Sequence, residues 1–248
     1  MLRCSIIIPT LNEVDCIGPT LLNLIQLQPY PFEIVVVDGG STDGTQAAIA
    51  QQAAISPIPI IVIHHAPGRA VQMNAGAATA KGEMLCFLHA DTWVPADVVG
   101  LIDQTLTPLD VVGGGFISLM QGPTVTRWGT SLHNYLKTFY APLLFRPHLF
   151  LRGLRLLFGD QVIFCRAEAF LACGGFDPAM PIMEDGDLCL RLVRQGRLQL
   201  VNRVVFSSDR RVAQWGPLRA NLIYLMIGVL WGVGLPTPWL KRFYEDVR

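Results

Sequence analysis

Short apolar runs alternate with helical patterns through the first half of the chain. Four apolar runs predict strands at 5–9, 33–38, 57–65 and 83–91. Between them, apolar residues recur at helical spacing and predict helices at about 14–28, 41–54 and 68–82. Strands separated by helices of this length are typical of parallel βαβ units. We therefore expect an α/β fold with a doubly wound, Rossmann-like central sheet flanked by helices.

The second half has a less regular pattern. Apolar runs predict strands at 111–119 and 199–208, an aromatic and basic helical segment at 127–158, a strand and a short helix within 161–176, and a loop leading into a helix within 181–196. Further on, no charged residue occurs from Ala220 to Leu240. The dense apolar part of this segment, Leu222 to Leu235, has 14 residues. At about 1.5 Å per residue a helix of this length is shorter than the ~30 Å hydrocarbon core of a bilayer. We expect a helix that lies at the membrane interface or packs on the protein, with a membrane span as the alternative.

Composition and charge narrow the class of protein. Hydrophobic residues make up 51% and charged residues 15% of the 248 positions. The six cysteines form no CxxC pair, so we expect reduced cysteines in a cytoplasmic protein. The N-terminal MLRCSIIIPT enters a strand at once, and we expect no signal peptide.

Charge is distributed unevenly along the chain. Residues 1–119 hold three basic and ten acidic side chains, whereas 120–248 hold sixteen basic and nine acidic ones. The basic second half indicates an anionic partner, such as phosphate groups or a membrane surface. Nucleic acid is the least favoured of these partners, because the basic segment is apolar and the other half is acidic.

Polar residues gather where the predicted strands end. In doubly wound sheets ligands bind beyond the carboxyl ends of the strands. These ends carry Thr10, Asn12 and Glu13, then Asp38, then 65–69, and finally His89 and Asp91. Asp38 can accept a hydrogen bond from a nucleobase or a ribose hydroxyl, whereas the glycine turn that follows it lacks the GxGxxG spacing of a dinucleotide site.

The stretch FLHADT, residues 87–92, is a candidate metal and phosphate site. In an extended strand His89 and Asp91 would share one face. Hard divalent cations are usually held by one or two carboxylates together with substrate phosphates, a role that suits Asp91. A neutral imidazole at His89 can ligate Mn²⁺ better than Mg²⁺, or can bond a phosphate or sugar oxygen. The alternative is a solvated strand end.

Two further motifs carry charged groups. MEDGDL (183–188) places acids at the start of a predicted helix. They either cap this helix, or one of Glu184 and Asp185 acts as a general base. In SSDRR (207–211), the arginines are either solvated or clamp a phosphate.

The order and spacing of these motifs resemble the family 2 glycosyltransferases of the GT-A fold. The matching stretches are SIIIPTLNE, EIVVVDGGSTDGT, GRAVQMNAGAATAKGEMLCFLHADT, GGF (174–176) and MEDGDLCLRL. The match covers residues 4 to about 196. FLHADT, GDQ (159–161) and MED also resemble a bacterial subgroup that keeps His-Ala-Asp in place of Asp-x-Asp.

The resemblance implies an inverting transfer of a sugar from a nucleotide-diphosphate donor, with a UDP-sugar favoured. It implies Asp185 as the catalytic base with Glu184 beside it, and a divalent metal, Mn²⁺ or Mg²⁺, on Asp91 with His89 as a second candidate ligand. The other implied contacts to the nucleotide-sugar come from Thr10, Asn12, Glu13, Asp38, Arg69, Asn74, Ala90 and Arg211. Asp160 and Gln161 would face the acceptor, which is unknown and could be lipid-linked.

We accordingly expect one GT-A domain over residues 1–212, with the nucleotide-sugar half at 1–119 and the acceptor half at 120–212. Residues 213–248 form an apolar and basic helical appendage. The expected location is the cytoplasm, peripherally on the inner face of the cell membrane. Two alternatives remain: a degenerate, membrane-associated nucleotide-sugar-binding protein, and a nucleotidyltransferase. The position just after the first strand reads TLNE, whereas a nucleotidyltransferase is expected to carry a glycine-rich loop with a lysine there.

Overall fold

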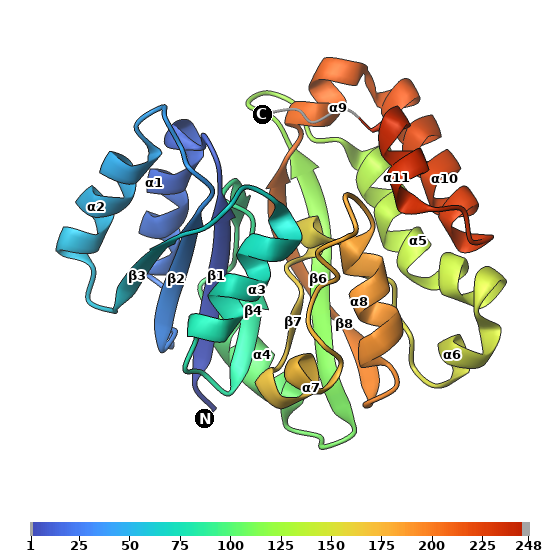
Figure 1. Ribbon diagram of the computed structural model, residues 1–248, viewed down its shortest axis with the longest axis horizontal. Helices are drawn as coiled ribbons and strands as arrows, with labels where there is room; N and C mark the ends of the chain where they lie inside the picture. Colours follow the sequence, from blue (N-terminus) through green and yellow to red (C-terminus); the bar gives the residue numbers. More distant parts are fainter. Residues whose placement is uncertain (1, 245–248) are drawn as a thin grey trace.

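The computed structural model describes residues 2–244, which form one eight-stranded sheet (Figure 1). The strand order is β3-β2-β1-β4-β7-β6-β8-β5. The strands are β1 Cys4–Thr10, β2 Glu33–Asp38, β3 Ile60–His64, β4 Met84–Phe87, β5 Thr92–Trp93, β6 Val111–Gln121, β7 Phe164–Arg166 and β8 Arg197–Ser208. Strands β3, β2, β1 and β4 are parallel to one another, and β6 is parallel to β8. Strand β7 is antiparallel to both β4 and β6, and β5 is antiparallel to β8. The expected α/β, mostly parallel GT-A-like sheet is therefore confirmed.

The apolar side chains of the strands point alternately to the two faces of the sheet. Helices cover both faces and bury these side chains in two cores. The α-helices are α1 Val14–Leu24, α2 Thr45–Ile55, α3 Arg69–Thr79, α4 Val98–Leu106, α5 Trp128–Phe145, α6 Pro147–Leu151, α7 Ala167–Ala172, α8 Glu184–Leu192, α9 Arg210–Trp215, α10 Pro217–Gly232 and α11 Thr237–Leu240. Ile6 and Ile8 of β1 pack in the core with α1, α2 and α4, whereas Ile7 packs in the core with α3, α7 and α8. Burial on both faces explains why these strands are continuous apolar runs.

The elements predicted for the first half are confirmed, although the fourth strand ends early, at Phe87, and two elements were not expected. The short strand β5 begins at Thr92, the last residue of FLHADT, and helix α4 follows it. The predicted helical segment 127–158 is confirmed as far as Leu151, as α5 and the short α6, and is wrong over 152–158, which are not helical. A 3₁₀ turn, η1, follows at Gly159–Gln161. Pro147 starts α6, where its missing N–H is harmless, and it separates α6 from α5.

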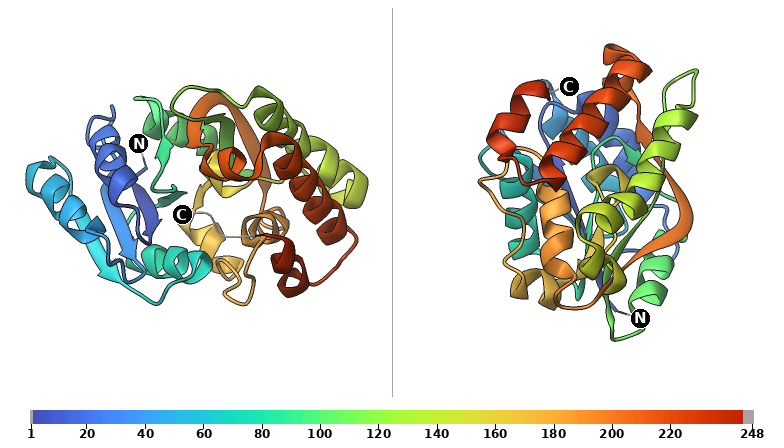
Figure 2. Two further views of the ribbon diagram at one scale, coloured as in Figure 1. Left: turned by 90° about the horizontal axis from the view of Figure 1, so that it is seen from above. Right: turned by 90° about the vertical axis from the view of Figure 1, so that its right-hand side faces the viewer.

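The C-terminal helices lie beside α5 and above the carboxyl ends of the parallel strands (Figures 1 and 2). Ile227 of α10 and Leu240 of α11 are buried in one small core with Ile182, which lies just before α8. Within residues 2–244, no helix combines the length and the apolar character that crossing a membrane requires. The last four residues of the predicted appendage, 245–248, lie outside the described part of the chain.

Candidate functional site

A cleft lies over the carboxyl ends of the parallel strands, where the sequence predicts a ligand. Its volume is about 610 Å³, which is in the range of ligand sites. Ten of the predicted site residues line it: Thr10, Glu13, Arg69, His89, Ala90, Asp91, Asp160, Glu184, Asp185 and Arg211. The cleft thus joins residues from both halves of the sequence.

Asn12 and Asp38 lie beside this cleft: Asn12 is in the loop that follows β1, and Asp38 is the last residue of β2. The Asn12 backbone has a φ of 56°, and its side-chain oxygen accepts a hydrogen bond from the Thr42 amide (2.9 Å). The buried Asp38 accepts hydrogen bonds from the Ser41 hydroxyl and from Gln46 Nε2 (2.8 Å). Burial opposes ionisation of Asp38, but these hydrogen bonds outweigh it and lower its pKa. Both side chains shape the loop edge, and their contact with a nucleoside stays a prediction.

Two further predicted residues, Asn74 and Gln161, also do not line the cleft. Asn74 was expected in the nucleotide-sugar pocket, but its amide donates to the Phe176 carbonyl (2.8 Å) and accepts from the Phe176 N–H (2.9 Å). Gln161 was expected to face the acceptor, but it is buried, accepts from the Phe158 N–H (3.1 Å) and donates to the Thr138 hydroxyl (3.1 Å). Both amides are therefore used inside the fold, where they hold neighbouring segments in place.

The FLHADT stretch is not extended as the sequence predicted. Strand β4 ends at Phe87, and the Thr92 N–H bonds the His89 carbonyl (3.2 Å), which closes a turn over 89–92. The argument that His89 and Asp91 share the face of a strand is therefore wrong. The turn still brings both side chains to the cleft.

His89 has a ring nitrogen without a partner. Its Nε2 atom is buried and makes no hydrogen bond. Burial lowers the pKa of His89, and the positive charge of Arg69 lowers it further against the opposing effect of nearby acids. Gly159 packs against this ring: a Cβ atom at position 159 would lie 2.3 Å from Nε2. Only glycine fits here. The lowered pKa of His89 favours its neutral form, in which Nε2 makes no hydrogen bond.

Arg210 contacts two acids of the cleft, Glu13 and Asp91. Its Nη2 lies 2.9 Å from Glu13 Oε2 and 2.8 Å from Asp91 Oδ2. The neighbouring Arg211, which the resemblance favoured, instead donates to the Tyr244 hydroxyl, and its guanidinium lies 4.4 Å from the centre of that ring. Arg210 begins α9, and the SSDRR motif contained it without showing which arginine enters the acidic site.

The acids of MEDGDL begin α8 and are buried. Arg69 from α3 forms an ion pair with Glu184, and the Gly159 N–H donates to Asp185 Oδ2 (2.9 Å). Burial raises the pKa of Asp185 to about 7, and the charge of Glu184 adds to this, whereas Arg69 and the Gly159 hydrogen bond lower it. A carboxyl group with this pKa can take up and release a proton near neutral pH.

Asp160 and Lys137 form the other wall of the cleft with Asn134. The Asn134 amide donates to Asp160 Oδ2 (3.0 Å), and the Lys137 ammonium lies 3.8 Å from the centre of the Phe158 ring. Burial lowers the pKa of Lys137 to about 8, against the opposing charge of Asp160. Lys137 was not predicted, because a single lysine within an aromatic segment gives no motif.

The donor set fits a metal ion only if substrate oxygens complete its coordination. In the described part of the chain, no group of three or more His, Cys, Asp or Glu side chains is placed to hold a metal. Asp91 and the unpaired Nε2 of His89 are two candidate ligands in one cleft. One carboxylate with phosphate oxygens is a common way to hold Mg²⁺ or Mn²⁺, so these residues fit an ion that arrives with a diphosphate.

Sequence comparisons show the family of this chain. Residues 5–166 match the model of "Glycosyl transferase family 2". The chain is similar to a PGL/p-HBAD biosynthesis glycosyltransferase of Mycobacterium bovis (32% identity over 75% of this chain and 68% of the relative). It is also similar to a pre-mycofactocin glycosyltransferase of Mycobacterium tuberculosis (27% identity, 84% of this chain and 43% of the relative). The chain belongs to glycosyl transferase family 2.

Solved structures with the same fold share little sequence with this chain. A mannosyltransferase from Pyrobaculum calidifontis, solved with GDP-Man and Mn²⁺, superposes with a TM-score of 0.73 at 20% identity, over 97% of this chain and 67% of that one. Glucosyl-3-phosphoglycerate synthase from Mycobacterium tuberculosis, solved with Mn²⁺, UDP and glucosyl-3-phosphoglycerate, gives 0.63 at 21% identity, over 95% and 81%. Against two curated relatives, the chain spans only 41% and 43% of their length.

Proposed function

We propose that this protein is an inverting glycosyltransferase that moves a sugar from a nucleotide-diphosphate donor, with a UDP-sugar favoured, to an acceptor hydroxyl. One observation carries the proposal: the buried Asp185 carboxyl, with a pKa raised to about 7, shares a cleft with Asp91 and Arg210. Family membership and the fold support it. The solved relatives with GDP-Man and Mn²⁺, or with UDP and Mn²⁺, support the class of donor.

Asp185 is the proposed base. Its carboxylate takes the proton of the acceptor hydroxyl as that oxygen forms a bond to the anomeric carbon. The bond from the anomeric carbon to the diphosphate oxygen breaks, and the electron pair leaves with the diphosphate. The Gly159 N–H holds one carboxylate oxygen of Asp185. Glu184 holds Arg69, so that its positive charge lies beside the reacting groups.

The donor is held at the other end of the cleft. Thr10, Asn12, Glu13 and Asp38 are the proposed nucleoside side of the site. Arg69 and Arg210 supply fixed positive charge for the diphosphate, an interaction that is strong in a partly dehydrated cleft. A divalent ion, when bound through Asp91 and His89, would neutralise charge on the leaving diphosphate.

Thermal-shift measurements test the class of donor. UDP-, GDP- and dTDP-sugars are each added with and without Mn²⁺, and one nucleotide is expected to raise the melting temperature well above the other two. No stabilisation by any of them in either metal condition would contradict the proposal. Transfer or donor hydrolysis that is unchanged in Asp185→Ala would contradict the assigned base.

The metal is tested through His89. In His89→Asp a second carboxylate joins Asp91, and oxygen ligands favour Mg²⁺ over nitrogen ligands. We expect the ratio of Mg²⁺ to Mn²⁺ affinity, measured calorimetrically with UDP present, to rise about tenfold. An unchanged ratio would exclude His89 from the metal site.

The same proposal places the protein peripherally on a membrane. Helices α5 and α10 pack against each other and expose apolar side chains to solvent: Trp128, Leu132, Leu136, Leu143 and Leu144 on α5, Leu218, Leu222, Leu225 and Val229 on α10, and Val233 just after α10. We call these ten residues the apolar face. Arg219 within α10 and Arg242 further along the chain are also exposed. An apolar surface flanked by positive charge is typical of proteins that lie on anionic membranes.

A further inference from the structure

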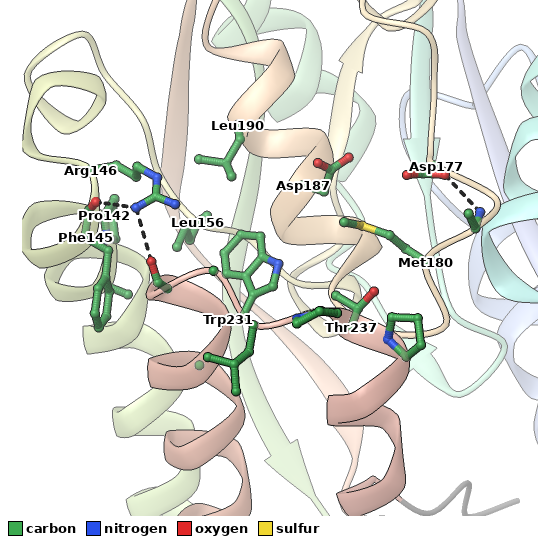
Figure 3. A pocket seen from close by; sticks show the side chains of 18 residues that line it. Pro142, Phe145, Arg146, Leu156, Asp177, Met180, Asp187, Leu190, Trp231 and Thr237 are labelled. Carbon is green, nitrogen blue, oxygen red and sulfur yellow. Dashed lines mark hydrogen bonds between the residues drawn. The ribbon is translucent and has the colours of Figure 1, made fainter.

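A second cavity lies beside the cleft, between α5, α8, α10 and α11 (Figure 3). Its volume is about 490 Å³, within the range of small-molecule sites. Nothing in the proposed chemistry uses it. Its wall is mostly apolar and includes Pro142, Phe145, Leu156, Met180, Leu190 and Trp231.

The charged groups around this cavity already have partners. Arg146 donates to the carbonyls of Phe145 (2.7 Å) and Gly232 (3.1 Å), as Figure 3 shows. Asp187 forms an ion pair with Arg191 (2.6 Å). Asp177 accepts a hydrogen bond from the Ala179 amide (2.9 Å). These contacts hold the charged groups of Arg146, Asp187 and Asp177 at the wall, and most of the remaining lining is apolar.

The cavity adjoins the cleft along two segments of the chain. Met180 lines both. On α10, Tyr224 and Ile227 line the cleft, and Gly228 and Trp231, one turn further, line the cavity. The Trp231 ring also reaches α8 beside the proposed base: a Cβ atom at Gly186 would lie 3.0 Å from its edge.

We propose that this cavity holds the aliphatic chain of an amphiphilic acceptor whose hydroxyl-bearing head lies at Asp185. This inference rests on the proposed function and names the class of acceptor. The adjoining cleft accounts for the polar head, and the apolar wall accounts for the chain. The volume suits part of one acyl or isoprenoid chain and excludes a folded protein segment. The apolar face on α5 and α10 would bring the protein to the membrane in which such acceptors reside.

Binding of alkyl glucosides tests the chain length that the cavity accepts. Methyl, hexyl, octyl and decyl glucoside, kept below micelle-forming concentrations, compete with 1-N-phenylnaphthylamine for the protein. We expect one saturable site per chain, no competition by the methyl compound, and affinity that rises about fourfold per added methylene until the cavity is full. Equal affinity for all chain lengths would overturn the inference.

Gly228→Leu places bulk inside the cavity without a clash, because nothing lies within 4 Å of a Cβ atom at this position. The matched control is Gly129→Leu on α5, where the space is equally open and which does not line the cavity. Leucine is the better helix former, so both variants should stay folded. Decyl glucoside binding is expected to fall at least about tenfold in Gly228→Leu and to persist in Gly129→Leu, because only the first leucine fills space that a chain of methylenes would occupy.

The rise in melting temperature on adding a nucleotide-sugar is measured for the same proteins. It separates the proposed chain site from the proposed function. Decyl glucoside binding that is unaffected by Gly228→Leu, or lost equally in both variants, overturns the chain site while the donor proposal stands. Chain binding without any nucleotide-sugar binding by the unmodified protein overturns the proposed function, and the acceptor assignment with it.

Discussion

Asp185 is a carboxyl group in surroundings that oppose its charge. It is buried at the start of α8, next to Glu184, and the nearby Arg69 is already paired with that neighbour. The Gly159 amide donates one hydrogen bond to its carboxylate. The arrangement that destabilises the carboxylate also makes it a stronger base. Catalytic sites often lose stability in this way while they gain reactivity.

Asp185→Asn is expected to lower transfer about 10²- to 10⁴-fold while nucleotide-sugar binding persists. In the unmodified protein, the catalytic rate should rise as the pH increases through about 7, where Asp185 loses its proton. A rate profile with no inflection between pH 6 and 8 would contradict this assignment.

The same substitution should stabilise the fold. The pKa of Asp185 is higher in the folded protein than its ordinary value of 3.8, so its contribution to stability is fully present below that value and is lost as the pH rises through about 7. Asn removes the buried charge and keeps the acceptor for the Gly159 N–H. We expect the melting temperature to rise by roughly 5 °C at pH 8 and by less at pH 5. Equal shifts at both pH values would contradict the raised pKa.

Arg210 and Arg211 form a matched pair of cations with different contacts. Arg210→Met removes the positive charge between Glu13 and Asp91. UDP affinity, measured by calorimetry without metal, should fall about ten- to a hundredfold, because a charged hydrogen-bond donor to the diphosphate is lost.

Free Mn²⁺ should bind more tightly to Arg210→Met, because two carboxylates lose their counterion. Arg211→Met, whose guanidinium contacts Tyr244, is the control and should change both affinities less. The reverse ranking would restore Arg211 as the phosphate ligand.

At the scale of elements, Asn74 joins α3 to the turn at Phe176, from which the chain runs to the base. Asn74→Ala removes both hydrogen bonds to the Phe176 backbone and should cost about 1–3 kcal/mol of stability. Because the turn precedes the segment that lines the cleft, transfer should fall as well.

The control for Asn74→Ala is Asn23→Ala. Asn23 makes the same double contact with the Val94 backbone, away from the base (3.2 and 3.0 Å). Asn23→Ala should lose similar stability, read by urea unfolding, and keep its activity at temperatures where both variants are folded. Equal activity in the two variants would show that the hydrogen bonds of Asn74 contribute to stability and not to transfer.

The elements of the first half could be predicted because each strand is an uninterrupted apolar run between helical patterns. The side chains of the cleft were harder. Arg210 and Arg211 are adjacent on a helix, where neighbouring side chains point about 100° apart, so only the rotation of α9 selects one of them. The partner of Asn74 lies 102 positions away, and Gln161 turns inward in a 3₁₀ turn. No local pattern encodes these contacts.

At the scale of the whole molecule, the acidic and basic halves of the sequence meet across the cleft. Arg69 of the acidic half pairs with Glu184 of the basic half, and Arg210 of the basic half pairs with Glu13 and Asp91 of the acidic one. Part of the uneven charge that indicated an anionic partner is therefore neutralised by ion pairs within the protein.

The apolar face belongs to this scale too. The unmodified protein should sediment with vesicles of phosphatidylcholine and phosphatidylglycerol, because its apolar side chains enter the interface and its arginines meet the anionic lipid. Added salt should weaken binding only in part, because screening leaves the apolar contribution. The double variant Leu222→Glu and Val229→Glu should reduce binding at least about tenfold.

The control for the membrane measurement is Leu109→Glu, which changes an exposed leucine outside the apolar face. It should leave vesicle binding unchanged. Full recovery of the unmodified protein in the supernatant at low salt, without detergent, would contradict peripheral attachment.

The ion pairs across the cleft also order its assembly during synthesis. Glu13 and Arg210 are 197 positions apart, Asp91 and Arg210 are 119 apart, and Arg69 and Glu184 are 115 apart. Contacts between such distant positions close large loops and form late in folding. A nascent chain that stops before β8 has made Glu13 and Asp91 but not yet Arg210. Glu13 and Asp91 therefore lack Arg210 as a counterion until the last quarter of the chain has been made, and the cleft gains its full set of ion pairs only then.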